Sequence, residues 1–168
     1  FMDVNLFSDL TFAENPVPNF TKLKKTCSGG QLYVPSVGAG TANTEFEVLT
    51  GMNLDEFGTG EYPYKTILQQ KSCESICYNL RELGYTTHGF HNNTGTFYSR
   101  HTAYKNLGFH TFTPLEYMSG YAVNPLGWAK DECLTAQIIE AMESTEKQDF
   151  VFAVSVQGHG KYPTEPVE

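Results

Sequence analysis

A glycine-rich loop leads directly into a predicted helix at Thr41. The run Val37-Gly-Ala-Gly40 precedes the threonine, and residues 41–50 have a helical pattern that ends at Gly51. Glycines let a ligand approach the backbone closely, and the first turn of a helix offers unpaired N–H groups and a partial positive charge. An anion can bind there, and a hydroxyl there is helped to become an alkoxide. Thr41 is therefore a candidate nucleophile; the structural alternative is that it only N-caps its helix.

A second polar segment, residues 91–100, brings a histidine, an aromatic residue and an arginine close together in sequence. They are His91, Tyr98 and Arg100. The planar arginine fork can donate two parallel hydrogen bonds to a phosphate, and a histidine can donate one and change charge near neutrality. Taken singly, the three have structural alternatives: a solvated loop histidine, a core aromatic and a surface ion pair. Their residue types suit a phosphate ligand.

A third candidate, His159, lies in a glycine-rich loop directly after an apolar run. Residues 150–156 form a β-rich run typical of a strand, and Gly158-His-Gly160 follows. Taken alone, a histidine in such a loop is unremarkable. We assign no role to the other histidines, which are His88, His101 and His110.

The elements that must position these residues alternate between helical and β-rich runs. Predicted helices cover residues 19–25, 41–50, 67–83, 100–107 and 131–142, and predicted strands cover residues 31–36, 85–90 and 150–156. Such alternation implies an α/β fold with a largely parallel sheet. Ligands collect at the carboxyl ends of parallel strands, and the loops with Thr41, His91 and His159 each follow a predicted strand. We therefore expect the three loops to converge on one edge.

The composition narrows the classes of function. The 168 residues carry a net charge of -8, which offers no broad positive field for a nucleic-acid backbone. No apolar run approaches the roughly 20 residues that a membrane-spanning helix needs. The four cysteines lack the spacing of a structural zinc site and leave a disulfide possible. Cys73 and Cys77 are expected to be neighbouring buried thiols on the predicted helix 67–83.

The segment Thr41-Ala-Asn-Thr-Glu-Phe46 closely resembles the nucleophile segment of lipoteichoic acid synthases and related phosphoglycerol transferases of the alkaline phosphatase superfamily. Residues 7–10, 18–23, 61–65 and 80–85 extend the resemblance along the chain. It implies a three-layer sandwich of the alkaline phosphatase or sulfatase type, truncated at the C-terminus. Residues 1–168 would then be the N-terminal and central part of a single sulfatase-like extracytoplasmic catalytic domain.

The resemblance also implies the binding residues. His91-Asn-Asn-Thr-Gly-Thr-Phe-Tyr-Ser-Arg100 is similar to the family's phosphoglycerol-binding segment, so substrate contacts are expected from His91, Asn93, Tyr98 and Arg100. Many family members carry tryptophan where Tyr98 stands, an exchange that preserves stacking on glycerol. His159 would complete the set, with Gly158 in place of the family's usual asparagine.

A divalent metal ion, Mn²⁺ or Mg²⁺, is implied by the same resemblance. Family members hold it through an early glutamate, the nucleophilic threonine (here Thr41) and a later Asp-His pair. The register places Asn5 at the glutamate position, and a neutral carbonyl oxygen binds a metal less strongly than a carboxylate. Either the site is altered, or the register differs, or Asp3 compensates. The Asp-His pair is expected well beyond Tyr162, so we expect the 168-residue piece alone to be inactive.

The implied reaction is transfer of glycerol phosphate from a phosphatidylglycerol-like lipid, through a phospho-threonine at Thr41, to a glycan or polyglycerolphosphate acceptor. The implied location is the extracytoplasmic face of a bacterial membrane, with the anchor outside this chain. A sulfatase or phosphodiesterase of the same superfamily is one alternative, although no Cys/Ser-X-Pro-X-Arg segment surrounds Thr41. A non-catalytic module that binds glycerophosphate is the other, and Asn5 favours it.

Overall fold

The computed structural model describes residue 9 and residues 11–34 and 40–160, and the chain divides into two units. The first unit, Phe1–Val34, contains helix α1, Pro18–Thr26, which agrees with the helix predicted there. Pro18 stands in its first turn, where a missing N–H costs nothing. The predicted strand 31–36 is wrong over its described residues 31–34, which are exposed and form no ladder. An alternating pattern makes a strand only where another strand pairs with it.

The second unit, Pro35–Glu168, is built on a parallel sheet in the order β2-β1-β3. Its strands are β1, Thr86–His91, β2, Thr111–Pro114, and β3, Asp149–Val154. In the register of β1 and β3, His91 lies opposite Val154. The carboxyl ends of both strands therefore meet at one edge, as the sequence predicts. Strand β2 was not predicted, because a four-residue run that ends in a proline has too little periodicity to recognise.

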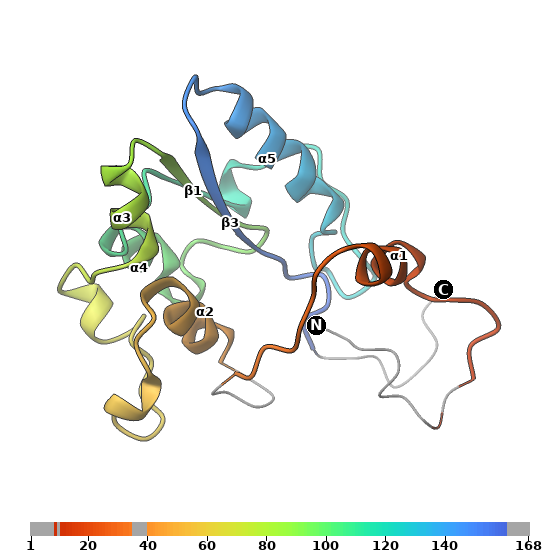
Figure 1. Cartoon of the computed structure of the whole chain (residues 1–168), viewed down its shortest axis with the longest axis horizontal. Helices are drawn as coiled ribbons and strands as arrows, with labels where there is room; N and C mark the ends of the chain where they lie inside the picture. Colours follow the sequence, from red (N-terminus) through yellow and green to blue (C-terminus); the bar gives the residue numbers. More distant parts are fainter. Residues whose placement is uncertain (1–8, 10, 35–39, 161–168) are drawn as a thin grey trace. The chain divides into compact units, whose positions relative to one another are not determined.

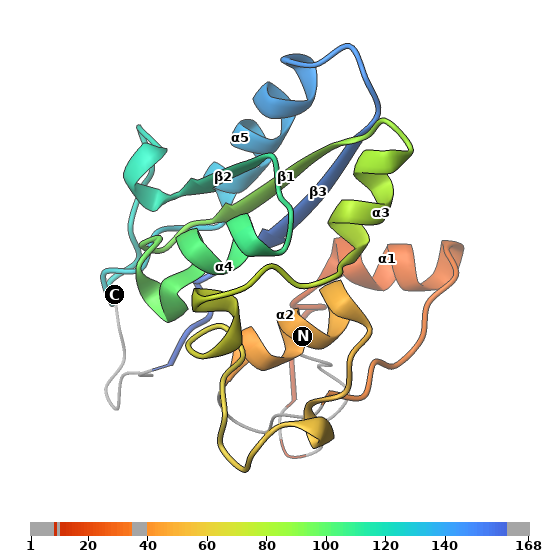
Figure 2. The same cartoon turned by 90° about the vertical axis from the view of Figure 1, so that its left-hand side faces the viewer.

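Helices cover both faces of this sheet, so the described part of the unit has three layers (Figures 1 and 2). On one face, helices α2, Thr41–Thr50, and α4, Arg100–Asn106, enclose a core that includes Tyr104 and Phe46. On the other face, α5, Glu132–Glu143, packs Leu134 near Phe90. The α/β fold with a largely parallel central sheet is thus confirmed.

Neighbouring side chains on β3 illustrate the two faces. Phe150 and Phe152 pack against the core under α2 and α4, whereas Val151 packs toward α5. On β1, Gly89 lies so close to Tyr104 that an added Cβ would come within 2.6 Å of the ring. The sheet and α4 approach each other closely only because this position carries no side chain.

The predicted helix 67–83 is broken in the structure. A short 3-10 turn, Ile67–Gln69, is separated from α3, Ile76–Glu82, whose N-cap is Ser75. The Ser75 hydroxyl accepts a hydrogen bond from the Cys77 N–H, so its local bonding starts a new helix at this point. Cys73 consequently lies outside the helix, and all four cysteines are free thiols. No described helix has the length and apolarity to cross a bilayer.

Candidate active site

Thr41 is the first residue of α2, and its N-cap is Gly40. Gly40 has a φ of 88°, a left-handed conformation that glycine adopts without strain. The interpretation of Thr41 as the N-cap is therefore wrong, because that place belongs to a residue without a side chain. Thr41 is exposed, and no side chain among the described residues caps this helix end. The hydroxyl thus stands beside uncapped N–H groups at the positive end of a ten-residue helix.

Glu45, one helical turn after Thr41, holds the predicted arginine. Both side chains are almost completely buried, and the Arg100 Nε donates to Glu45 Oε2 at 3.1 Å while Nη2 donates to Oε1. The Tyr104 hydroxyl donates to Glu45 Oε2 at 3.0 Å. Burial opposes the charged form of Arg100, but the hydrogen bonds and charge of Glu45 outweigh it and raise the pKa of the guanidinium. The pair therefore fixes the 97–100 segment against α2.

The geometry limits what Arg100 can offer to a phosphate. Its Nη1 donates to the Phe97 carbonyl at 3.2 Å, so hydrogen bonds among the described residues use three of its five N–H groups. Only 1% of the residue is exposed. The sequence predicts an arginine free to neutralise phosphate oxygens; here the guanidinium also neutralises a buried carboxylate. Its contact with substrate stays a prediction that relies on the remaining N–H groups.

Tyr98 and Ser99, directly before Arg100, both have left-handed backbone conformations, with φ of 56° and 54°. Such conformations are strained in residues with a Cβ and cluster at functional sites. The Tyr98 ring stacks on Tyr62 at 5.6 Å, with the Lys65 ammonium 5.0 Å from its centroid. Burial, with the influence of Tyr62 added, raises the pKa of Tyr98 against the opposing effects of Arg100 and the Gly40 backbone. The predicted glycerol contact of Tyr98 stays a prediction.

His91, the last residue of β1, is held in one tautomer. Its Nδ1 lies 2.8 Å from the Val154 carbonyl, which can only accept, so Nδ1 carries the proton. The buried Nε2 has no partner among the described residues. Burial, aided by the Arg100 charge, lowers the pKa of His91 to about 4. The expectation that His91 changes charge near neutrality is therefore wrong, and the free nitrogen accepts rather than donates a hydrogen bond.

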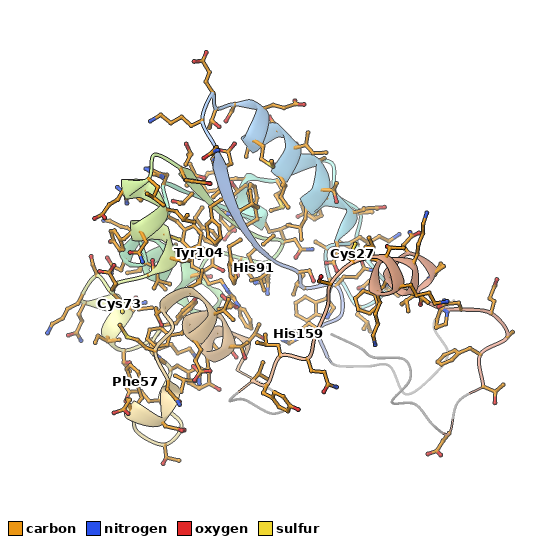
Figure 3. All side chains as sticks on the ribbon, viewed as in Figure 1. Cys27, Phe57, Cys73, His91, Tyr104 and His159 are labelled. Atoms are coloured by element: carbon orange, nitrogen blue, oxygen red, sulfur yellow. The ribbon has the colours of Figure 1, made fainter. Side chains whose placement is uncertain are left out.

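His159 lies beyond β3 and next to two aromatic rings. The ring centroids of Phe97 and Trp128 are 6.0 Å and 4.9 Å from its own. Phe97 also stacks on His91 at 6.5 Å and lies 5.6 Å from the Arg100 guanidinium. Figure 3 labels His91, beside the sheet, and His159, farther along the chain that leaves β3. Phe97 therefore links three of the predicted site residues.

Asn93 is the remaining predicted contact, and its visible role is local. Its side-chain oxygen accepts a hydrogen bond from the Thr94 N–H at 2.8 Å, and its carbonyl accepts one from the Leu115 N–H at 3.1 Å.

The structure also places at this site three residues that the sequence did not single out, namely Glu45, Phe97 and Trp128. Glu45 was detectable as the acidic residue one turn after Thr41; Phe97 and Trp128 gave no signal, because only the tertiary structure brings their rings to His159.

The described residues do not form a metal site. They contain no group of three or more histidine, cysteine, aspartate or glutamate side chains arranged to hold an ion. Asn5 and Asp3, the predicted early ligands, lie outside the described residues. Thr41 is the one predicted ligand that can be placed, and a lone hydroxyl does not make a metal site. The described residues thus supply only one of the expected ligands, and we derive no step through the ion.

The described unit is a three-layer α/β fold in which β1 ends at His91, and Phe97 links this histidine to Arg100 and His159. The family model described as Sulfatase matches residues 2–168. The chain belongs to this family.

Two curated relatives come from Rhizobium meliloti (strain 1021). A putative cyclic beta-1,2-glucan modification protein is 33% identical over 96% of this chain and 24% of its own length. The capsular polysaccharide biosynthesis protein RkpI is 30% identical over 89% of this chain and 28% of its own length. The chain thus spans about a quarter of the length of these relatives.

Solved structures share the fold. The phosphoglycerol transferase GacH of Streptococcus pyogenes, in complex with sn-glycerol-1-phosphate, is 24% identical with a TM-score of 0.72, over 88% of this chain and 39% of that one. The lipoteichoic acid synthase LtaP of Listeria monocytogenes is 22% identical with a TM-score of 0.64, over 76% and 31%. At these identities the comparisons establish the fold alone.

Proposed function

We propose that the complete protein is a phosphoglycerol transferase that moves glycerol phosphate from a glycerophospholipid to a cell-envelope glycan or teichoic acid acceptor. The observation that carries the proposal is the exposed Thr41 hydroxyl at an uncapped helix start, one turn before the Glu45–Arg100 pair. Similarity in fold to GacH and LtaP supports the same chemistry, as does the family membership. Residues 1–168 would supply the N-terminal and central part of its catalytic domain.

The reaction has two displacements. Thr41 Oγ1 loses its proton and attacks the phosphorus of the lipid, the bond from phosphorus to the diacylglycerol oxygen breaks, and that oxygen takes up a proton to leave as diacylglycerol. An acceptor hydroxyl then loses its proton and attacks the same phosphorus, the bond from phosphorus to Thr41 Oγ1 breaks, and Oγ1 takes up a proton. The helix start stabilises the negative charge that develops on the phosphate oxygens.

The surrounding residues have proposed roles that follow from their hydrogen bonding. The free Nε2 of His91 accepts a hydrogen bond from a glycerol hydroxyl, since the Nδ1 proton is committed to Val154. Tyr98 and Asn93 line the glycerol, and the remaining N–H groups of Arg100 and the exposed His159 contact the phosphate or leaving group. Mn²⁺ or Mg²⁺ stays a predicted cofactor whose ligands other than Thr41 lie outside the described residues.

The donor and the acceptor are also part of the proposal. We expect a phosphatidylglycerol-like donor at the extracytoplasmic face of a bacterial membrane, reached through anchoring segments outside this chain. The two relatives are named as a putative glucan modification protein and a capsular polysaccharide biosynthesis protein, and these names favour a glycan acceptor. Hydrolysis, as in a phosphodiesterase, would differ in that water replaces the acceptor.

The test is a comparison of Thr41→Ala, Thr41→Ser and Thr50→Ala in the complete protein. Thr50, at the other end of α2, is the matched loss of a hydroxyl. With phosphatidylglycerol, a β-glucan and Mn²⁺, we expect Thr41→Ala to lose more than about 10³-fold in diacylglycerol release. Thr41→Ser should retain part of the activity and Thr50→Ala most of it.

Mass spectrometry of the Thr41 peptide and of the glucan separates the possible outcomes. A glycerol phosphate adduct on Thr41 and on the glucan supports transfer. An adduct on Thr41 with only free glycerol phosphate as product would establish a hydrolase. Turnover that survives Thr41→Ala would refute the assignment of the nucleophile, and no turnover under any condition would favour the binding module.

A further inference from the structure

A buried asparagine next to His91 joins three separate parts of the chain. Asn92 is 0% exposed, and its Oδ1 accepts a hydrogen bond from the Val156 N–H at 2.8 Å. Its Nδ2 donates to the Ala129 carbonyl at 3.2 Å and to Asp131 Oδ1 at 2.9 Å. One side chain at the end of β1 therefore ties the segment after β3 to the segment before α5.

Asp131 and Gln157 form a reciprocal pair beside this asparagine. The Gln157 N–H donates to Asp131 Oδ1 at 3.1 Å, and the Asp131 N–H donates to Gln157 Oε1 at 2.8 Å. A further bond runs from Asn124 Nδ2 to the Gln157 carbonyl at 3.3 Å. We refer to Asn92, Asp131 and Gln157 as the Asn92 network. Its members satisfy one another's polar atoms, which is what fixes a conformation in a partly buried setting.

The network controls the residues directly before His159. The His159 N–H donates to the Val156 carbonyl at 2.8 Å, so His159 is built on the residue that Asn92 holds. The His159 ring is 4.9 Å from Trp128, which lies in the segment that Ala129 and Asp131 anchor. The network thus fixes both the backbone that carries His159 and the ring against which it packs.

We propose that Asn92, Asp131 and Gln157 are positioning residues that set His159 for its contact with the phosphate or leaving group. This inference rests on the proposed function, because it takes His159 to touch the substrate. Catalysis is sensitive to such placement, and a displacement of about 1 Å can cost on the order of a hundredfold in rate. None of the three residues needs to touch the substrate to have this effect.

The activity test compares removal of the network with its conservative replacement in the complete protein. Asp131→Ala removes the acceptor, whereas Asp131→Asn keeps an oxygen that can receive both hydrogen bonds. We expect Asp131→Ala and Gln157→Ala to lower kcat about 10- to 100-fold with little change in KM, and Asp131→Asn to restore most of it. Gln137→Ala on α5 is the matched glutamine control. If Asp131→Ala does not fold, the exposed Gln157 still permits the comparison.

A second readout follows the position of His159 without any turnover. Trp128 is the one tryptophan in this chain, and its ring centroid lies 4.9 Å from that of His159, so its fluorescence reports on this contact. The Trp128 signal is obtained as the difference between proteins with and without Trp128→Phe. At one fixed pH, we expect its emission to change in His159→Gln and to change in the same direction in Asp131→Ala and Gln157→Ala, but to stay as in the wild type in Asp131→Asn.

The two readouts distinguish failure of the inference from failure of the proposed function. A network variant that keeps the wild-type Trp128 emission but loses activity would overturn the positioning role, as would one whose emission changes as in His159→Gln while its full activity is kept. If His159→Gln is fully active, the proposed role of His159 fails, even though the emission still reports how the network holds it.

Discussion

The position of His91 in the fold leaves its Nε2 without a hydrogen-bond partner among the described residues. Strand β1 ends at His91, and the parallel register sets its Nδ1 against the Val154 carbonyl of β3. That bond leaves Nε2 without a proton and, among the described residues, without a partner. A buried nitrogen with no partner is costly, so a hydroxyl from a ligand that binds it would recover a lost hydrogen bond. We therefore expect the ring to select a ligand that donates a hydrogen bond to Nε2.

The lowered pKa of His91 predicts how stability depends on pH. The folded value of about 4 is below the roughly 6.5 of an unfolded histidine, so between these values the unfolded chain binds the proton. Stability is therefore complete above about pH 6.5 and falls as the pH drops to 4, by up to about 3 kcal/mol. Unfolding free energies of wild type and His91→Gln, measured from pH 4 to 7, should diverge in slope. Parallel curves would contradict the prediction, and His101→Gln provides the exposed control.

Residue types were predictable at this site, but their pairings were not. The threonine after a glycine loop and the His–Tyr–Arg spacing identify candidates directly from the sequence. Arg100 binds Glu45, which lies 55 positions away in the chain, and Trp128 packs on His159, which lies 31 positions away. Only the fold brings these segments together. Spacing along a sequence carries no information on such contacts.

At the scale of elements, the Glu45–Arg100 pair joins α2 to α4. The two helices begin at the predicted site residues Thr41 and Arg100, so the pair sets the proposed nucleophile and the 97–100 segment relative to each other. A buried pair need not stabilise the fold more than apolar residues of the same size would. Its use here is geometric, since two fixed hydrogen bonds allow one arrangement of the helices.

Removal of one partner should be far worse than removal of both. Glu45→Ala leaves the Arg100 charge buried and unpaired, and we expect a loss of about 3–5 kcal/mol in the free energy of unfolding. The double change of Glu45→Leu with Arg100→Met should recover much of this stability while activity stays low. Urea denaturation measures the stabilities, with the exposed Glu143→Ala as the control. If the double variant were no more stable than Glu45→Ala, the interpretation of the pair would be wrong.

The elements that the sequence predicted well are those with strong local signals. Helices α2, α4 and α5 have a clear apolar face or a terminal glycine, and β1 and β3 are distinct β-rich runs. The prediction of one continuous helix over residues 67–83 failed because the spacing of the apolar residues does not reveal a break. Ser75, a good N-cap, starts a new helix within this range. The strand predicted for 31–36 failed where it is described because pairing is a long-range property.

At the scale of the whole molecule, β3 pairs with β1 alone among the described strands. Its other edge carries backbone N–H and C=O groups that no described strand satisfies, and its Phe150, Val151 and Phe152 are only partly buried. Edges of this kind template pairing with another chain. In relatives about four times as long, further chain is available to cover such an edge.

This arrangement predicts that residues 1–168, produced alone, self-associate through β3. Light scattering should give a mass that rises with protein concentration, and Ala153→Lys, a charge on the exposed side of the strand, should reduce it. The net charge of -8 disfavours association in general, so a mass that still rises points to a specific edge. Ala136→Lys, exposed on α5, adds the same charge elsewhere and should have a smaller effect. A segment that is monomeric at every concentration, or that responds equally to both lysines, would show that the β3 edge does not drive association.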